Sequence, residues 1–185
     1  MAVAFRKFFL SATAPFLDGG FMIFLETERL VLRSLMPEDA ETMIEYRNDP
    51  DCARYQRWEE NSREDILRLI RDFSRCVFLS EAKSQKYAVA LKSGELVGDL
   101  SYFFSPGDCV TLGYTVAPRY QRRGFAFEIL TAVLEKIREK YPEIDVVCLV
   151  DKDNLPSVNL LKKLGFEEEC YSEKIKSCIY VKKDK

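Results

Sequence analysis

The stretch "YQRRGFAFEIL", residues 120–130, decides the fold. Two arginines and a glycine, residues 122–124, stand directly before an apolar helical pattern. The first amide groups of a helix have no partner inside it, and the helix dipole adds positive potential there. A turn that aims these amides outward is a site for an anion such as a pyrophosphate, and Gly124 lets the backbone approach the ligand. Arg122 and Arg123 can add phosphate contacts, although a solvated basic loop before an ordinary helix explains the same residues.

The composition around this stretch is that of one soluble globular domain. The chain has 185 residues, which is enough for a compact domain with a sizeable core. Its formal net charge of −2 argues against a general nucleic-acid binder, which normally carries a basic surplus. No apolar run approaches the ~18 residues that a membrane span requires. We therefore expect neither a nucleic-acid partner nor a membrane partner.

The chain holds six cysteines and no histidine. No two cysteines form a C-x-x-C pair, and without histidine a zinc site is not expected. Scattered cysteines in a chain of this size indicate free thiols in a reducing compartment. We therefore expect a cytoplasmic protein that holds no metal.

The first 21 residues differ in character from the rest of the chain. They combine a basic pair, a short apolar stretch and small residues, which loosely imitates a secretory signal. The apolar stretch is soon broken by polar residues and Pro15. Patterned sequence begins at Met22. We therefore predict an N-terminal extension over residues 1–21 and a single domain over residues 22–185.

Apolar patterning on both sides of the quoted stretch predicts an α+β fold. The sheet is expected to be mixed but mostly antiparallel and to be flanked by helices, with one parallel pair from the strand–helix–strand unit of residues 110–150. The predicted elements are, in order, a strand over 29–35, a helix from Pro37, a helix over 62–73 capped by Ser62, strands over 86–92, 95–104 and 110–117, the helix after the quoted stretch to about Lys140, a strand over 146–150, a short helix stopped by Gly165, and strands over 166–171 and 175–181.

The turn also resembles a known signature. Gln121-x-x-Gly124-x-Ala126 is similar to the acyl-CoA pyrophosphate motif, [QR]-x-x-G-x-[GA], of the GNAT N-acetyltransferase superfamily. Its surroundings, "LGYTVAPRYQRRGFAFEIL", resemble the family's fourth strand, loop and third helix. Residues 26–50 resemble the opening strand and helix of the Rim-type branch, which acetylates N-terminal amines of ribosomal proteins. Residues 153–169 resemble that branch's N-x-x-S, short helix and L-G-F.

The resemblance implies a GNAT-type fold and a way of binding acetyl-CoA. The loop amides would hold the pyrophosphate, and the pantetheine arm would lie along the strand end like an added strand. Ser157 would lie near the sulfur, where its hydroxyl can hydrogen-bond or protonate the leaving thiolate, and the Val116 N–H would polarise the acetyl carbonyl. The cofactor-binding residues expected on this basis are Thr115, Val116, Ala117, Gln121, Arg122, Arg123, Gly124, Phe125, Ala126, Asn154 and Ser157; of these, Ser157 and Val116 are also the expected catalytic residues. The alternative for Asn154 and Ser157 is that they only cap and open a helix.

Two positions depart from the family pattern. Many members carry a tyrosine general acid four residues after the serine, and this chain has Leu161 there. Many carry a glutamate base on the fourth strand, and this chain has Thr111. The base is therefore unassigned. Asp99 is a possible substitute or a solvent-facing strand residue, and Glu95 and Glu128 are weaker candidates.

The reaction implied is direct attack of a neutral amine on the acetyl group of acetyl-CoA, with no covalent enzyme intermediate. The acceptor would be a primary amine on a small molecule or a protein N-terminus. It would be bound by the first two predicted helices, by residues 48–62 and by the strand ends near Tyr102 and Phe103. Within residues 48–62, the side chains that would either line an amine pocket or pack the helices onto the sheet are Tyr55, Arg57 and Trp58. The competing reading is a non-catalytic acyl-CoA-binding module, which the two departures favour, and a homodimer stays open.

Overall fold

The computed structural model describes residues 21–56, 58, 62–81, 84–105 and 109–183. The described residues form one eight-stranded sheet in the order β1-β2-β3-β4-β5-β6-β8-β7. Neighbouring strands are antiparallel throughout, except that β5 and β6 are parallel. The strands are β1 (Ile23–Glu26), β2 (Leu30–Arg33), β3 (Gln85–Leu91), β4 (Leu96–Ser105), β5 (Cys109–Val116), β6 (Asp145–Val150), β7 (Glu167–Ser172) and β8 (Ser177–Lys182). The predicted α+β class and the single parallel pair are both confirmed.

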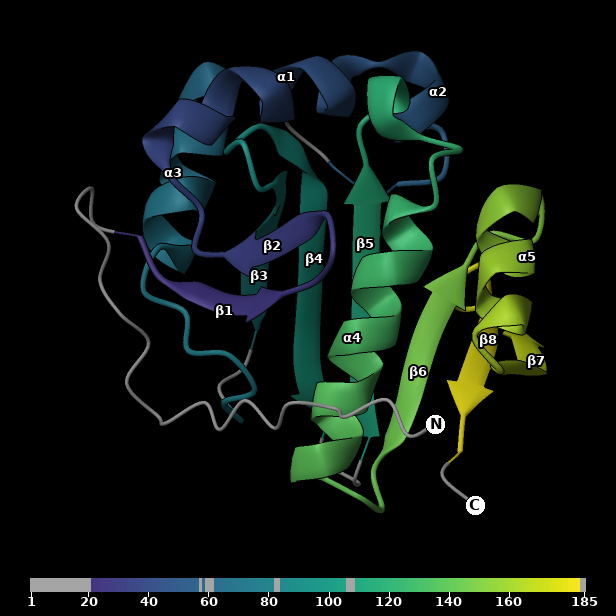
Figure 1. The fold of residues 1–185 in the computed structure, drawn as a ribbon. Helices are drawn as coiled ribbons and strands as arrows, with labels where there is room; N and C mark the ends of the chain where they lie inside the picture. Colours follow the sequence, from purple (N-terminus) through teal and green to yellow (C-terminus); the bar gives the residue numbers. More distant parts are fainter. Residues whose placement is uncertain (1–20, 57, 59–61, 82–83, 106–108, 184–185) are drawn as a thin grey trace.

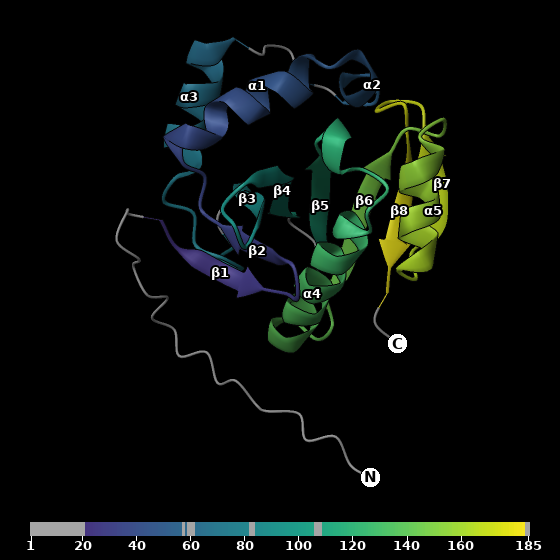
Figure 2. The same cartoon turned by 45° about the horizontal axis from the view of Figure 1, so that its top comes forward.

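Helices cover the sheet and one of its ends (Figure 1). The helices are α1 (Ala40–Asn48), α2 (Pro50–Ala53), α3 (Arg63–Phe73), α4 (Phe125–Lys140) and α5 (Leu155–Lys163), with 3-10 turns at Pro37–Asp39 and Pro118–Tyr120. Figures 1 and 2 show α1 and α2 above the end of the sheet toward which β5 points. α4 packs against β2 and β5, and α3 packs against α1 and β3.

The long helix α4 has the buried face that its sequence pattern predicts. Its apolar residues recur at helical spacing, and burying them is the main favourable term in packing the helix onto the sheet. The predicted face consists of Ile129, Leu130, Val133, Leu134 and Ile137, and all five are buried. Two end signals are also confirmed. Ser62 caps α3 by accepting from the Asp65 amide, and Gly165, with φ +83°, follows the end of α5.

Two short elements were not predicted. The single strand expected over 29–35 is in fact β2, which ends at Arg33 and is paired with the additional strand β1. β1 has only four residues, too few for an alternating pattern to be visible. The four-residue helix α2 was also missed; the Asp49 side chain begins it by accepting from the Cys52 amide.

The described chain begins at Phe21, so nearly all of the predicted extension lies outside the described residues. Met22 is joined to Ser34 by two hydrogen bonds of 2.9 Å, one between the backbones and one to the serine hydroxyl. No helix in the described part of the chain is long and apolar enough to cross a membrane.

The hydrogen bonding between β5 and β6 stops before either strand ends. Their parallel register runs from Cys109–Asp145 to Leu112–Cys148. β5 continues to Val116 along β4, and β6 continues to Val150 along β8. The two strands therefore separate beyond Leu112, and one edge of β5 is left without a strand partner at the end where α4 begins.

Gly98 of β4 lies in close contact with the backbone at the end of β5. It pairs with Val116, and a β-carbon at position 98 would lie 2.0 Å from the Thr115 carbonyl oxygen. Because the obstructing atoms belong to the backbone, Gly98→Ala should lower the free energy of unfolding by about 1–3 kcal/mol. Chemical denaturation measures this. The control is Gly113→Ala, whose added carbon would meet only the Ser101 hydroxyl at 3.0 Å. Equal losses in the two variants would contradict the account.

Candidate active site

The turn before α4 has the backbone geometry of an anion site. Gly124 is the residue that precedes the helix, with φ +80°, and Arg122 also has a positive φ of 62°. Left-handed residues in a turn direct successive amides to one side, and the first helical amides add to them. A non-glycine residue such as Arg122 is strained in this conformation. The strain is local and lies at the predicted phosphate turn.

A cleft of about 520 Å³ opens between this turn, the separated ends of β5 and β6, α2 and α5. Its size is within the range of ligand-binding clefts. Nine of the predicted cofactor-binding residues line it: Thr115, Val116, Gln121, Arg122, Gly124, Phe125, Ala126, Asn154 and Ser157. The structure thus brings together side chains and backbone from β5, the turn and α5.

Two of the predicted residues do not line the cleft. Ala117 is 3% exposed, and its amide donates to the Val97 carbonyl on β4. The Arg123 carbonyl accepts from Arg29, and the guanidinium of Arg123 lies 5.6 Å from the Tyr120 ring centroid. Their contacts are with the protein itself.

The backbone amide of Val116 faces the cleft side of β5. The Ala117 amide donates across to β4, and successive backbone groups of a strand point to opposite edges. The Val116 amide therefore points to the edge from which β6 has separated. Its carbonyl, on the same edge, accepts from Gln121 Nε2 at 3.0 Å. This bond ties the turn to the strand.

Asn154 and Ser157 lie at the start of α5. Asn154 Oδ1 accepts from the Ser157 amide at 3.2 Å, so the capping role holds for Asn154. The Ser157 hydroxyl lies 2.5 Å from the hydroxyl of Tyr114, which also lines the cleft. Burial raises the pKa of Tyr114 well above its ordinary value. Sequence reasoning missed Tyr114, although strand alternation places it on the same face as Leu112 and Val116.

The two cysteines that line the cleft are poor nucleophiles. Burial raises the pKa of Cys148 to about 12. Burial, reinforced by Asp49 and Asp99, raises the pKa of Cys52 to about 11. Only a thiolate attacks readily, so both thiols are inert near neutral pH. Within the described residues, no cluster of His, Cys, Asp and Glu could hold a metal ion.

None of the candidate bases lines the cleft. Asp99 is 2% exposed, so the solvent-facing reading is wrong. It accepts from Tyr46 at 2.6 Å and from Lys86 at 2.5 Å. Burial alone would raise the pKa of Asp99, but the Lys86 charge and these hydrogen bonds outweigh it and hold the pKa below its usual value. A carboxylate with a lowered pKa accepts a proton poorly.

The two residues that differ from the family pattern, and the weaker candidate base Glu95, also lie outside the cleft. Leu161 is fully buried, Glu95 is exposed beside the β3–β4 turn, and Thr111 pairs with Val147 inside the parallel ladder. The described carboxylate residues that line the cleft are Asp51 and Asp151. Sequence reasoning had not singled out either of them.

The predicted acceptor residues fall into separate places. Tyr55 lines the cleft, and its hydroxyl donates to the Asp153 carbonyl at 3.2 Å. The Arg47 guanidinium stacks on Trp58, with its central carbon 4.6 Å from the ring centroid. The buried Nε of Arg47 has no hydrogen-bond partner among the described residues. Tyr102 belongs to the core, being 1% exposed, whereas Phe103 is 41% exposed. Arg57 lies outside the described residues.

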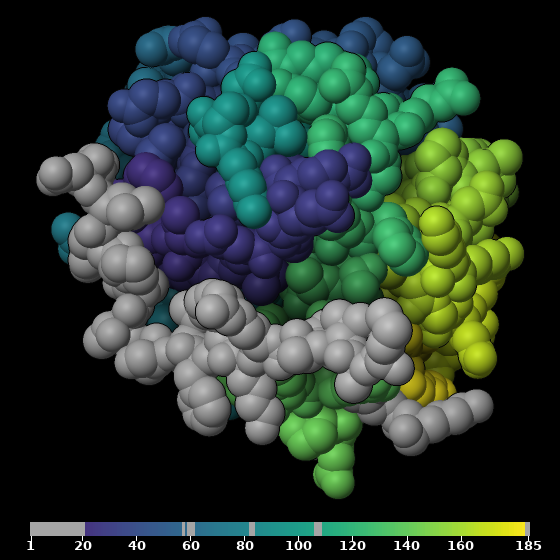
Figure 3. All heavy atoms as spheres, in the orientation of Figure 1, coloured from purple at the N-terminus to yellow at the C-terminus, as the bar shows by residue number. Residues whose placement is uncertain are grey.

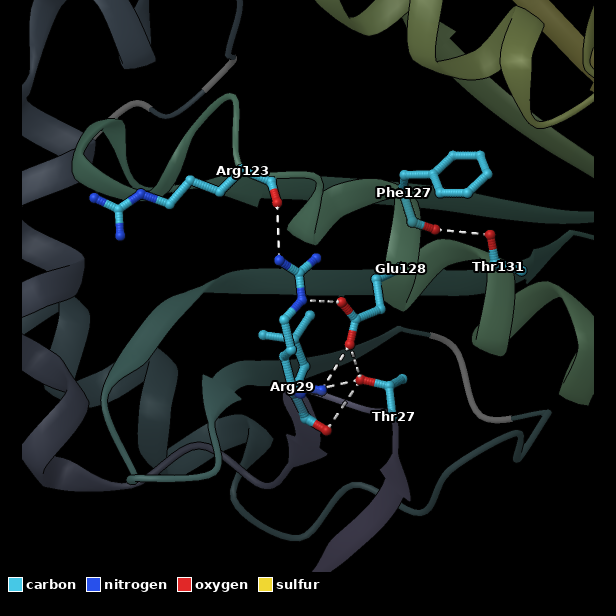
Figure 4. A network of polar contacts seen from close by, with 7 residues as sticks. Thr27, Arg29, Arg123, Phe127, Glu128 and Thr131 are labelled. Atoms are coloured by element: carbon cyan, nitrogen blue, oxygen red, sulfur yellow. Dashed lines mark hydrogen bonds and ion pairs between the residues drawn. The ribbon is translucent and has the colours of Figure 1, made fainter.

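The β1–β2 hairpin holds the turn in place (Figure 4). Glu128, in the first turn of α4, accepts from the Thr27 hydroxyl at 2.6 Å and from Arg29 Nε at 2.6 Å. Arg29 Nη1 also donates to the Arg123 carbonyl at 3.1 Å, and its guanidinium stacks on Phe125 at 4.6 Å. Figure 3 shows the hairpin lying against α4 on the molecular surface. Glu128 is thus a structural carboxylate that anchors the turn from outside the cleft.

Comparisons with known proteins identify the family and the fold. The family model of the acetyltransferase (GNAT) domain matches residues 29–167. The uncharacterized N-acetyltransferase YoaA of Bacillus subtilis is 27% identical over 149 residues, which cover 78% of this chain and 83% of YoaA. A GNAT-family acetyltransferase from Bacillus anthracis has a TM-score of 0.74 at 23% identity, covering 88% of this chain and 99% of that one. RimL, a ribosomal alpha-N-protein acetyltransferase in complex with coenzyme A, has a TM-score of 0.73 at 14% identity, covering 87% and 97%.

The anchor predicts a specific pH dependence. Burial alone would raise the pKa of Glu128, but the hydrogen bonds from Thr27 and Arg29 lower it. A lowered pKa in the folded state means that the anchor stabilises the fold above the ordinary glutamate pKa and is lost as the pH falls through the folded-state pKa. Glu128→Gln should therefore reduce the free energy of unfolding at pH 7. The expected loss is only about 1 kcal/mol, because Arg29 is partly exposed and solvent weakens its ion pair with Glu128.

Thermal unfolding measured from pH 7 to pH 3 checks this dependence. The difference in melting temperature between Glu128→Gln and the unmutated chain should close as the pH falls below about 4. Glu139→Gln is the control, because its ion pair with Lys136 is an exposed pair on the same helix. A gap that stays constant with pH would show that the charge of Glu128 does not contribute.

Proposed function

The chain belongs to the GNAT acetyltransferase family, and we propose that it moves the acetyl group of acetyl-CoA to a primary amine. The observation that carries the proposal is the cleft in which the outward amides of the turn and the free edge of β5 meet. A pyrophosphate suits the first feature and an extended, amide-bearing arm suits the second. RimL, which has the same fold, is described as a complex with coenzyme A.

The chain's own groups support direct attack on the thioester. The Val116 amide faces the cleft and would donate to the acetyl oxygen as negative charge develops there. The cleft thiols of Cys52 and Cys148 keep their protons, so neither is suited to take up the acetyl group. Holding an amine beside a thioester supplies much of the rate through proximity. The proton of the amine would pass to solvent.

Ser157 is placed to assist the leaving group. Its hydroxyl lines the cleft beside the free edge of β5, along which the pantetheine arm would run. An O–H donated to the sulfur would stabilise the thiolate as the C–S bond breaks. Leu161 has no proton to donate and is fully buried, so it has no part in this step.

The acceptor would be a small-molecule amine or a protein N-terminus. RimL is described as an acetyltransferase of a ribosomal protein's alpha-amine, which makes peptides a first choice of acceptor. The test is to incubate the protein with acetyl-CoA and a panel of peptides, polyamines, amino acids and aminoglycosides while following free thiol. Release of thiol with one amine supports the proposal. Tight binding without release from any amine would favour the non-catalytic acyl-CoA-binding module.

The phosphate turn is tested by Gly124→Glu. The substitution adds bulk and a negative charge where the pyrophosphate would lie, so acetyl-CoA affinity should fall at least about tenfold, or roughly 1.4 kcal/mol. Isothermal titration measures the loss. Gly124→Ala is the matched control, because it shares the strain of a positive φ while its β-carbon has only an ordinary contact with Arg29. Unchanged affinity in the glutamate variant would remove the phosphate-site argument.

The leaving-group role is tested by Ser157→Ala. If the hydroxyl acts on the departing sulfur, kcat should fall about 10- to 100-fold, or roughly 1.4–2.7 kcal/mol, with acetyl-CoA affinity nearly kept. Steady-state kinetics with the amine found above and titration with coenzyme A separate the two effects. An unchanged kcat would leave Ser157 as a helix-opening residue. Lost affinity with normal turnover would make it a binding residue.

A further inference from the structure

Two hydroxyl groups that line the cleft face one another. Tyr114 stands on β5 and Ser157 stands in the first turn of α5, and their oxygens are 2.5 Å apart. Each hydroxyl can donate one proton and accept others. The bond between them uses one of the two protons. The second proton is free to be donated to a third group.

The chemistry of the pair decides which proton is free. A phenol is a stronger acid and a weaker acceptor than an aliphatic alcohol, so Tyr114 donates and Ser157 accepts. Burial also raises the pKa of Tyr114, so the phenol keeps its proton in the neutral range. The Ser157 proton is then the one left for a ligand. Donation from Tyr114 polarises the Ser157 hydroxyl and strengthens the bond that it gives.

The other hydroxyls that line the described cleft are differently placed. Tyr55 donates to the Asp153 carbonyl, and Thr115 Oγ1 lies 3.5 Å from Gln56 Nε2. Tyr120 belongs to the turn before α4, where its ring packs with Phe125 and the Arg119 and Arg123 guanidinium groups. The hydroxyl pair is therefore a distinct feature of the side of the cleft between β5 and α5. Leu161, one helical turn after Ser157, supplies no hydroxyl, and Tyr114 reaches Ser157 from the strand instead.

We propose that Tyr114 is a positioning residue, which donates to Ser157 Oγ and so directs the serine proton toward the sulfur of the departing thiol. This inference rests on the proposed function. In the step, the amine nitrogen forms the C–N bond, the C–S bond breaks with its electron pair on sulfur, and Ser157 donates a hydrogen bond to that thiolate. The amine loses its proton to solvent, and the thiolate takes one from solvent. Tyr114 keeps its own proton throughout.

The experiment is a double-mutant cycle of Tyr114→Phe, Ser157→Ala and the double variant. Phenylalanine keeps the packing of the ring and removes only the donor. Tyr114→Phe should lower kcat about 5- to 30-fold and leave the Kd for coenzyme A within about twofold. Because the two hydroxyls act as one unit, the double variant should lose no more than Ser157→Ala alone. The control is Tyr102→Phe, which removes a buried hydroxyl bonded to Tyr87 and should leave kcat unchanged.

Each other outcome counts against the inference. An unchanged kcat in Tyr114→Phe, or losses that multiply in the double variant, would mean that Tyr114 does not act through Ser157. A fall in coenzyme A affinity with normal kcat would make Tyr114 a binding residue. If the unmutated chain transfers no acetyl group to any amine, the proposed function fails and the inference with it, whereas an active unmutated chain with a normal Tyr114→Phe variant overturns the inference alone.

Discussion

The structure depends on one break in a hydrogen-bond ladder, where β5 and β6 stop pairing after Leu112 and Cys148. Unpaired backbone groups are costly when buried, and here they are left at the edge of an open cleft. β4 and β8 hold the outer edges of the two strands, so the break opens a gap without ending the sheet. The gap provides space for an extended ligand, and it exposes the Val116 amide and the hydroxyl pair on one side.

The second requirement is that a strained turn stays in place beside this gap. Left-handed backbone at Arg122 has to be compensated by bonds elsewhere. Those bonds come from distant parts of the chain: Arg29 and Thr27 hold Glu128 and the Arg123 carbonyl, and Gln121 holds the Val116 carbonyl. Thr27 and Arg29 reach Glu128 and the Arg123 carbonyl from the β1–β2 hairpin (Figure 4), whereas Gln121, Arg122 and Gly124 line the cleft. The side of the turn that faces the cleft therefore stays free for an anion.

Local signals in the sequence were sufficient for part of this site. The apolar period of α4, the glycine before it and the strand–helix–strand unit predict the turn and the parallel pair, because each depends on neighbouring residues. Asp99 and Tyr114 depend on partners far along the chain. Alternation assigns a residue to a face of a strand, but it does not show that Lys86 and Tyr46 meet Asp99 in the core or that α5 brings Ser157 to Tyr114. β1 and α2 have four residues each, too few for periodicity to be read.

The central claim is that the broken ladder and the turn together form one binding site for acetyl-CoA. A crystal structure of the chain with coenzyme A tests it most directly. The account predicts that the pyrophosphate lies on the amides of residues 124–126, that the pantetheine arm runs along residues 114–116 as an added strand, and that the sulfur lies within hydrogen-bond reach of Ser157 Oγ. Coenzyme A bound outside the cleft, or bound in it with the pyrophosphate away from the turn, would contradict the account.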